Sequence, residues 1–380
     1  MPKQEAVAPN MNNILSVSEI LDKNLKSKFP NLREIPEIIF FINYLRSLEK
    51  EKIIDFSQPS VQKKKSLFIP ASNGGSISAL AILFSLASGI KTVVREPRKG
   101  FGIEMNILLD LFKEVELFKE RLIIVDASHF KKIINNEKFS FLLAWGSNST
   151  RPEIEKIAKK TSSSLYFFGS QVSLSIVDID EMNSLNEAKK RRVIDSYIAD
   201  ILTFDQSGCT NSKFSIFITK NTSGIKNFTN DVNIFAEKSR HEETLSIQEK
   251  SGFLIKSYGL SNPSFMKKTF SLSERIWFIK LEKTYEDLFD DLDQIRSGVV
   301  IYKIADSTPS AVKMLENLPN FGRITFYSSE ISYLTKEHEF DKKLEDKLLN
   351  IGYSNSLSFV WDGIDLSSIF KNETINVYPN

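Results

Sequence analysis

The sequence predicts an α/β protein of two units, the first a doubly wound parallel sheet and the second a further α/β unit. From residue 66 onward, short segments that are apolar on both faces alternate regularly with helical patterns. At 380 residues the chain has room for two domains with an ample core. Hydrophobic residues make up 41% and charged residues 26%, the ordinary balance of a soluble globular protein.

Four strand-and-helix pairs fill the first half of the chain. We expect strands at 67–69, 92–94, 122–125 and 139–145, each followed by a helix, at 76–88, 102–115, 128–135 and 151–160. Buried strands separated by helices indicate a parallel sheet, so this half should form a Rossmann-like unit. Ahead of it, residues 1–12 are expected to be disordered, 17–51 to form two helices, and 58–65 to be a polar connector.

The second half continues the alternation less regularly. Strands are expected at 164–168, 174–179, 214–218, 275–279, 299–304 and 324–327, and helices at 184–203, 225–240, 285–295 and 310–318. We therefore divide the chain into an N-terminal helical segment (1–57), a cofactor-binding domain (58–204), a catalytic cysteine domain (205–350) and a C-terminal segment (351–380).

Charge and composition exclude several classes of partner and location. Fifty basic and 48 acidic residues give a formal net charge of +2, so no strong field for nucleic acid or an anionic membrane is expected. The longest apolar run, 77–90, is broken by three serines and Gly89, and reads as a buried helix rather than a membrane span. The first 13 residues are polar and resemble no signal sequence. One cysteine excludes an intrachain disulfide, which favours the cytoplasm.

Cys209 is that single cysteine, and it lies at a bend. A long helical pattern ends before it, small polar residues surround it, and an alternating apolar strand pattern begins at Lys213. A lone cysteine is more often an inert, buried thiol than a nucleophile. A bend, however, can present a thiol to a cleft, and a reactive thiol needs backbone N–H groups or positive charge nearby to lower its pKa.

Three strand ends carry turn chemistry of the kind that cofactor sites use. The turn 70–75 contains Asn73, whose amide could stabilise an oxyanion. Gly146 and Ser147 follow a strand and precede a helix, where N–H groups favour a pyrophosphate. Arg95 ends another strand and offers a cation to a ribose phosphate. Taken singly, each of these turns is more often a connection between a strand and a helix than a ligand site.

The sequence contains no motif for the common nucleotide-binding loops or for a histidine metal site. The chain contains neither the Gly-x-Gly-x-x-Gly fingerprint nor a Gly-x-x-x-x-Gly-Lys-Ser/Thr loop. The three histidines, His129, His241 and His338, are far apart in polar contexts and do not make a metal set, so no metal is expected.

Six short segments, taken in order, resemble the aldehyde dehydrogenase superfamily. They are Ser72-Asn73 before a helix, Arg95-Glu96-Pro97 after a strand, Trp-Gly-Ser at 145–147, a glycine bend at 168–170 with Gly169, Asp-Gln-Ser-Gly-Cys at 205–209 and Trp-Asp-Gly at 361–363. The resemblance covers about residues 60 to 365. Within the superfamily, the chain is most similar to the bacterial acyl-CoA reductases of the luminescence type (LuxC).

The resemblance implies an NADPH-dependent reduction of a fatty acyl thioester to an aldehyde. Cys209 would be the nucleophile, with Asn73 and the Cys209 N–H holding the oxyanion. Arg95, Gly146, Ser147 and Gly169 would bind the cofactor. The implied partners are acyl-CoA or another acyl thioester and an acyl-transfer protein, with a homo-oligomer expected by analogy and neither nucleic acid nor a membrane span.

Two departures from the superfamily pattern bear on the chemistry. Phe167 stands where typical aldehyde dehydrogenases have the glutamate that activates water, which favours reduction or acyl transfer over hydrolysis. Arg95 replaces the usual lysine, which keeps the charge and changes its geometry. Two alternatives stay open: a CoA-acylating aldehyde dehydrogenase that acts on a shorter substrate, and a degenerate, non-catalytic partner subunit.

Overall fold

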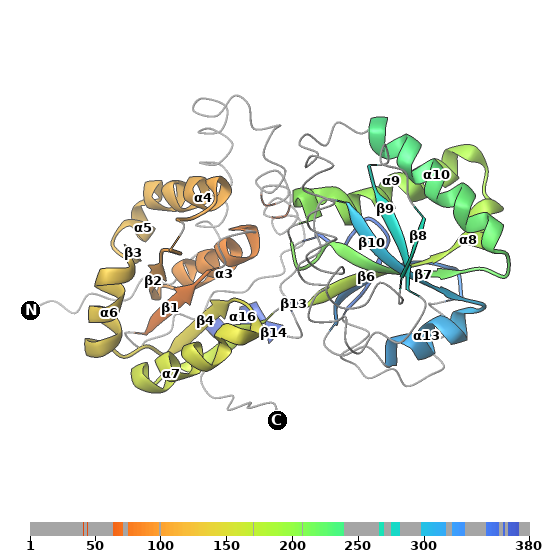
Figure 1. Cartoon of the computed structure of the whole chain (residues 1–380). Helices are drawn as coiled ribbons and strands as arrows, with labels where there is room; N and C mark the ends of the chain where they lie inside the picture. The colour runs from red at the N-terminus through yellow and green to blue at the C-terminus, as the bar shows by residue number, and fades with distance from the viewer. Residues whose placement is uncertain are drawn as a thin grey trace, which may run out of the picture. The chain divides into compact units, whose positions relative to one another are not determined.

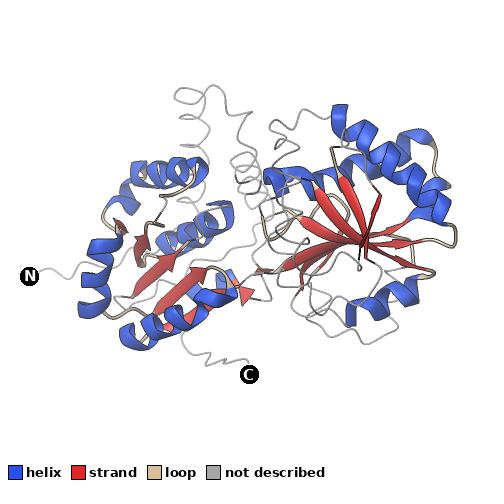
Figure 2. Ribbon diagram, in the orientation of Figure 1, coloured by secondary structure: helices blue, strands red, loops and turns tan. Residues whose placement is uncertain are grey.

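The structure is a computed structural model, and its chain divides into two compact units (Figures 1 and 2). The first unit comprises Met1–Ser170 and Leu357–Asn380, and the second comprises Gln171–Ser356. The structure describes residues 41, 44, 64–70, 75–98, 100–169, 171–206, 208–238, 266–269, 275–281, 298–316, 321–330, 347–356, 360–361 and 364–371. In this part of the chain, no helix combines the length and the apolar character that crossing a membrane requires.

The first unit is built on a parallel sheet of five strands in the order β3-β2-β1-β4-β5. The strands are β1 (Lys65–Ile69), β2 (Lys91–Arg95), β3 (Leu122–Val125), β4 (Phe141–Trp145) and β5 (Ser164–Phe168). The chain winds outward from β1 to β3 and then crosses back to β4, so the strand order reverses between β1 and β4. In open α/β sheets, ligands bind outside the carboxyl ends of the strands at such a reversal.

Helices cover both faces of this sheet (Figure 1). On one face lie α3 (Gly75–Ala87), α4 (Ile103–Glu114) and α16 (Leu366–Lys371), and on the other lie α6 (Ala127–Asn136) and α7 (Arg151–Thr161). Adjacent residues of one strand serve the two cores, since Phe68 packs with the first group and Leu67 with the second. Every residue of α3 is buried, which explains why its sequence contains no charged residue and only small polar ones.

The second unit contains a sheet of seven strands in the order β12-β11-β6-β7-β10-β9-β8, with all pairs parallel except β8 with β9. The strands are β6 (Val172–Asp178), β7 (Ser212–Ile218), β8 (Met266–Thr269), β9 (Trp277–Leu281), β10 (Val299–Ala305), β11 (Phe321–Tyr327) and β12 (Leu348–Asn350). One face packs on α8 (Ile179–Asn183), α9 (Glu187–Leu202) and α10 (Thr222–Lys238), and the other on α13 (Thr308–Glu316).

The expected α/β alternation is confirmed throughout the described residues, with ends that differ by a few residues. Short elements were not expected: α5 (Glu116–Lys119), η2 (Asn148–Thr150), α8, η3 (Thr203–Gln206), β8, β12, β13 (Val360–Trp361), β14 (Ile364–Asp365) and α16. The helices expected at 17–51 and 285–295 lie outside the described residues, apart from single positions of the former.

The compact units divide earlier than the boundary expected at 204. Residues 171–204 belong to the second unit because β6 pairs with β7 and β11 in the larger sheet, and α9 packs on that sheet. The C-terminal segment also divides: 351–356 belongs to the second unit, whereas 357–380 returns to the first. Buried Trp361 accordingly packs in the first unit's core.

Candidate functional site

Cys209 lies in a short loop between η3 and β7 of the second unit, and its side chain is exposed. The thiol is therefore accessible to reagents and is not sealed in the hydrocarbon core. The hydrogen bonds around this loop, residues 206–211, decide whether the thiol is held in one place. We call this segment the cysteine loop.

Gln206 fixes the start of the cysteine loop. Its side chain is fully buried, and its backbone adopts a left-handed conformation with φ of 57°. The amide nitrogen donates to Val299 O at 2.8 Å and to Ser212 O at 3.0 Å. The amide oxygen accepts from the N–H groups of Gly298 at 3.0 Å and Val299 at 3.1 Å. Gln206 therefore continues the hydrogen bonding between β7 and β10 beyond the strand pairing itself.

Asn211 and Ser173 hold the rest of the loop. Buried Asn211 accepts from Gly208 N at 2.8 Å and donates to Thr203 O at 2.7 Å, so it joins the loop to the start of η3. The hydroxyl of Ser173, on β6, donates to the carbonyl of Cys209 at 2.8 Å. The peptide that carries the thiol is thus held from the neighbouring strand.

Lys213 is the described cation nearest to Cys209 in the sequence. It lies on β7, and its side chain is only 1% exposed. A positive charge in the vicinity of a thiol favours the thiolate form. The sequence showed Lys213 only as the start of a strand. The structure shows in addition that this lysine is buried.

In the first unit, Gly146 and Ser147 follow β4, at the reversal in strand order. A Cβ atom on Gly146 would lie 2.6 Å from the Thr150 hydroxyl, which itself donates to Ser147 O at 2.7 Å. Gly146 N also bonds Phe168 O at 3.2 Å, joining the carboxyl ends of β4 and β5. The position therefore leaves no room for a side chain, and Gly146 lies half-buried ahead of α7.

Gly169 follows β5 at the same edge of the sheet. A Cβ atom there would collide with the Asn148 side chain and approach the Phe167 ring to 3.2 Å. Phe167 lies half-buried on β5, with the guanidinium of Arg151 5.7 Å above its ring centroid. Gly146, Ser147 and Gly169 are thus brought together around the start of α7.

Arg95 ends β2, two strands away from β4 in the same sheet. Its guanidinium carbon lies 4.9 Å from the centroid of the Phe130 ring, on α6. Glu96 N donates to Val125 O at 2.8 Å, so β2 and β3 stay paired up to this edge. Sequence reasoning missed Phe130, because a phenylalanine one turn into a helix resembles any core residue.

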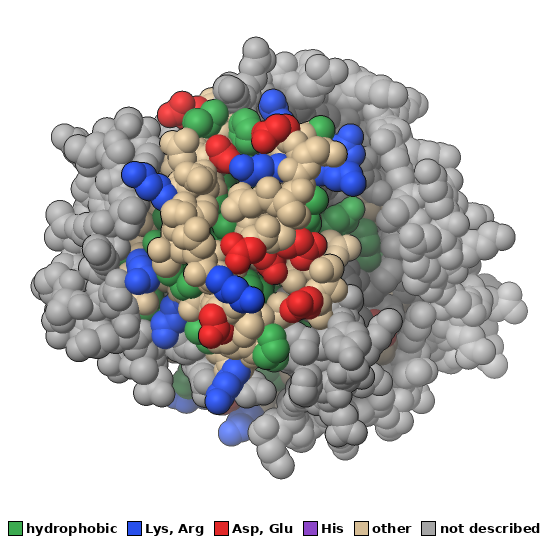
Figure 3. All heavy atoms as spheres, turned by 90° about the vertical axis from the view of Figure 1, so that its right-hand side faces the viewer, with side chains coloured by type: hydrophobic (Ala, Val, Ile, Leu, Met, Phe, Trp, Pro, Cys, Tyr) green, Lys and Arg blue, Asp and Glu red, His purple; other side chains and the backbone are tan. Residues whose placement is uncertain are grey.

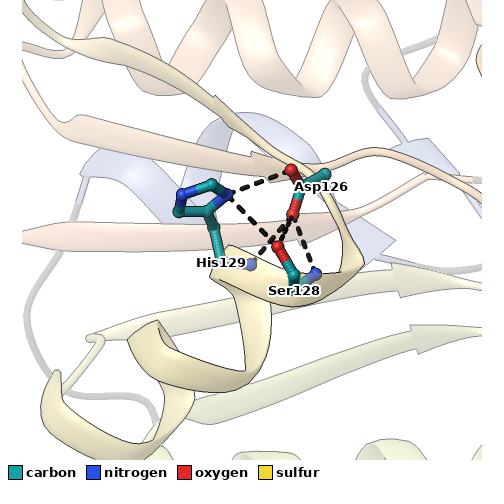
Figure 4. Close-up of polar contacts among 3 residues, drawn as sticks. All are labelled: Asp126, Ser128 and His129. Atoms are coloured by element: carbon teal, nitrogen blue, oxygen red, sulfur yellow. Dashed lines mark hydrogen bonds and ion pairs between the residues drawn. The ribbon is translucent and has the colours of Figure 1, made fainter.

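Asp126 follows β3 and caps α6 (Figure 4). Its Oδ1 accepts from the N–H groups of Ser128 and His129 at 2.8 and 2.9 Å, and its Oδ2 lies 3.0 Å from His129 Nδ1. These hydrogen bonds, led by that from the His129 N–H, hold the pKa of Asp126 well below its usual range. Ser128 Oγ donates to the same carboxylate at 2.7 Å, so the trio is a helix cap rather than a nucleophile with its base.

The remaining expected site residue, Asn73, lies outside the described residues. Cys209 belongs to the second unit, and the four expected cofactor residues belong to the first. Figure 3 shows one face of the second unit, on which acidic and basic side chains are interspersed. That face presents no field of a single sign, as a formal net charge of +2 would suggest.

Exposed polar side chains and a helix N-terminus lie together at the carboxyl edge of the first unit's sheet. The backbone at Gly146 has no room for a side chain, and the side chains from Ser147 to Thr150 are exposed and polar. The N-terminus of α7 follows them, with the cation of Arg151 at its first residue. A helix N-terminus with polar groups ahead of it is favourable for binding an anionic group such as a pyrophosphate.

Comparison with known families finds one match in the sequence. The family described as acyl-CoA reductase (LuxC) matches residues 42–245, which is more than half of the chain. A comparison with curated proteins finds no match.

Comparison with solved structures finds aldehyde dehydrogenases. A mutant aldehyde dehydrogenase from Bacillus cereus has a TM-score of 0.68 and 12% identity, covering 97% of this chain and 83% of that one. Succinic semialdehyde dehydrogenase from Streptococcus pyogenes, in complex with NADP+, has a TM-score of 0.65 and 11% identity, covering 99% and 92%. A mutant aldehyde dehydrogenase C from Pseudomonas syringae, with NAD+ and octanal, has a TM-score of 0.61 and 10% identity, covering 87% and 75%. The chain therefore has the aldehyde dehydrogenase-like fold.

Proposed function

The chain belongs to the acyl-CoA reductase (LuxC) family, and from that premise we propose that it reduces a fatty acyl thioester to an aldehyde with NADPH. Cys209 is the proposed nucleophile. The observation that carries this proposal is an exposed thiol on a loop whose backbone is held by two partly buried hydrogen bonds. A nucleophile held in one geometry reacts faster than a mobile one.

The first chemical step is acyl transfer to Cys209. Its thiolate sulfur attacks the thioester carbonyl, a new carbon–sulfur bond forms, and the bond to the carrier sulfur breaks. The carrier leaves as a thiol after it takes up a proton. The Cys209 N–H and the Asn73 amide are the proposed donors to the oxyanion, and each such donor is worth about 2.7–4 kcal/mol in other enzymes.

The cofactor is proposed to bind at the edge formed by Gly146, Ser147 and Gly169. Bound NADPH would supply the hydride that reduces the acyl carbon, after which the carbon–sulfur bond to Cys209 breaks, the aldehyde leaves and the thiolate is restored. Arg95 is proposed to receive the phosphate on the adenosine ribose, because its guanidinium is held over Phe130 at the end of β2.

Phe167 supports reduction rather than hydrolysis. Its phenyl ring packs beneath Arg151 and contains no group that could deprotonate water. An acyl group on Cys209 would therefore resist hydrolysis and react with hydride or with another thiol.

The test is NADPH oxidation with a panel of acyl-CoAs of increasing chain length, with the aldehyde product trapped and identified. We expect long-chain substrates to consume NADPH in the wild type and none to do so in Cys209→Ser. Arg95→Ala should raise the KM for NADPH while that for NADH stays unchanged. If no acyl-CoA consumes NADPH, the protein is not a reductase, and preference for short chains would favour the CoA-acylating alternative.

A further inference from the structure

A turn far along the sequence lies against the cysteine loop in the second unit. Residues 352–356 follow β12 and are separated by more than 140 positions from Cys209. The hydroxyl of Thr210, the residue after the cysteine, donates to Asn355 Oδ1 at 2.6 Å. Thr210 is 8% exposed and Asn355 is half-buried, so this hydrogen bond is partly shielded from water. We call residues 352–356 the clasp turn.

Arg323 holds the clasp turn from β11. Its guanidinium Nη1 donates to Ser354 O at 2.9 Å and to Ser356 O, so it binds the carbonyls on both sides of Asn355. The backbone N–H of Arg323 also donates to Ser173 Oγ at 2.9 Å. Since Ser173 donates onward to the Cys209 carbonyl, one residue of β11 reaches both the clasp turn and the cysteine loop.

Asp200 holds the clasp turn from α9. Its two oxygens accept from Gly352 N at 2.7 Å and Ser354 N at 2.9 Å. The backbone oxygen of Asp200 accepts from Asn211 Nδ2 at 3.3 Å, so α9 is joined to both segments. Gly352 has φ of 92°, and a Cβ atom there would lie 2.9 Å from that of Ser196 on α9, which explains why a glycine opens the turn.

We infer that Asn355 is a positioning residue for Cys209, acting through the hydroxyl of Thr210. Arg323 and Asp200 each fix the backbone of the clasp turn, so the Asn355 amide is presented to Thr210 from an anchored support. The neighbouring peptide, that of Cys209, is held by Ser173. The inference rests on the proposed nucleophilic role of Cys209 and adds a contribution from the end of the second unit, outside the family match at 42–245.

The expected effect of losing this hydrogen bond is larger on the acylation rate than on stability, because the bond sets the position of Cys209. One buried neutral hydrogen bond contributes about 1 kcal/mol to stability. Misplacing a reacting group by roughly 1 Å can cost about 100-fold in rate. A positioning hydrogen bond should therefore change the rate of acylation much more than it changes the unfolding free energy.

The experiment measures the rate at which acyl-CoA acylates Cys209 in the full chain without NADPH. Thr210→Val removes the hydroxyl at nearly constant volume, and Thr210→Ser retains it. We expect Thr210→Val and Asn355→Ala each to slow acylation by about tenfold or more, with substrate affinity little changed. In Thr210→Ser, Cys209 should be acylated at near the wild-type rate. The double variant should be no slower than the slower single variant, because both remove the same hydrogen bond.

A matched control lies at the other end of β7. Thr219 is also buried, and its hydroxyl donates to Asp180 Oδ1 at 2.7 Å and bonds the backbone of Asn221, so Thr219→Val removes at least as much hydrogen bonding away from the cysteine loop. It should leave acylation near the wild-type rate. The inference is overturned if Thr219→Val slows acylation as much as Thr210→Val, if Thr210→Ser is as slow as Thr210→Val, or if the two single effects multiply.

A second measurement separates this inference from the proposed function. If acyl-CoA does not acylate the wild type, the proposed function fails, but alkylation of Cys209 by iodoacetamide across pH still reports the setting of the thiol. We expect Thr210→Val to shift the pH midpoint of alkylation and Thr210→Ser to retain that of the wild type. Identical midpoints in all three proteins would contradict the positioning role.

Discussion

Replacing Gln206 with alanine should destabilise the second unit strongly. The change removes four hydrogen bonds, two donated to Ser212 O and Val299 O and two accepted from Gly298 N and Val299 N. Ser212 and Val299 are 0% exposed, so at least their groups lose their partners without regaining water. Each buried group left unpaired costs about 1–3 kcal/mol, and partial relaxation leaves about 3–5 kcal/mol for the site.

The backbone at this position provides an internal control. Gln206 has φ of 57°, where a residue with a Cβ atom is strained by roughly 1–2 kcal/mol and glycine is not. Gln206→Gly loses the same four hydrogen bonds but also loses that strain. We therefore expect the glycine variant to be more stable than the alanine variant by about 1 kcal/mol, the reverse of the usual order.

Urea unfolding followed by tryptophan fluorescence can test this in the second unit alone. The chain has three tryptophans, and only Trp277 belongs to the second unit, where its backbone N–H donates to Gly298 O at 2.7 Å. Trp145→Phe and Trp361→Phe leave it as the single reporter. The reasoning is refuted if Gln206→Ala unfolds within about 1 kcal/mol of its parent, or if the glycine variant is the less stable of the two.

Three further predictions concern the cofactor edge, the clasp turn and the thiol. Gly146→Ala should weaken NADPH binding, measured by nucleotide fluorescence, because its Cβ meets the Thr150 hydroxyl, and adding Thr150→Ala should recover part of the affinity. Burial raises the pKa of Asp200 above that in the unfolded chain, so the folded state holds the proton more tightly. The unfolding free energy of the second unit should then fall as pH rises from about 3.9 to the folded pKa, and Asp200→Asn should remove that contribution; a slope unchanged by the substitution would contradict it. Lys213→Met should slow the alkylation of Cys209 by iodoacetamide at neutral pH, whereas Lys213→Arg, which retains the positive charge, should not.

Much of the fold is readable from the sequence because its strands are buried on both faces. The run 122–125 becomes β3 with the expected ends, since its four apolar residues lie between Arg121 and the helix cap Asp126. The division between units is not readable in this way. The strand β6 could follow β5 in either sheet, and its partner β11 lies about 150 residues further on, so only tertiary pairing assigns it.

Some residues of the candidate site can be predicted from the sequence and others cannot. Cys209 and Gly146 can be found from local context, because a bend and a strand end are local features. Asn355 cannot be found in this way, because a polar turn resembles any exposed loop until Thr210 is placed beside it. Asp200 gives a weak signal, since it is an acid next to the buried Ile201 and three residues from Tyr197 on the apolar face of α9.

The most direct measurement is the mass of the protein after incubation with a long-chain acyl-CoA in the absence of NADPH. The account predicts one acyl group, attached to the peptide that contains Cys209, and its release as aldehyde when NADPH is added. An acyl group on any other residue, or one that persists in Cys209→Ala, would contradict the nucleophilic role of Cys209.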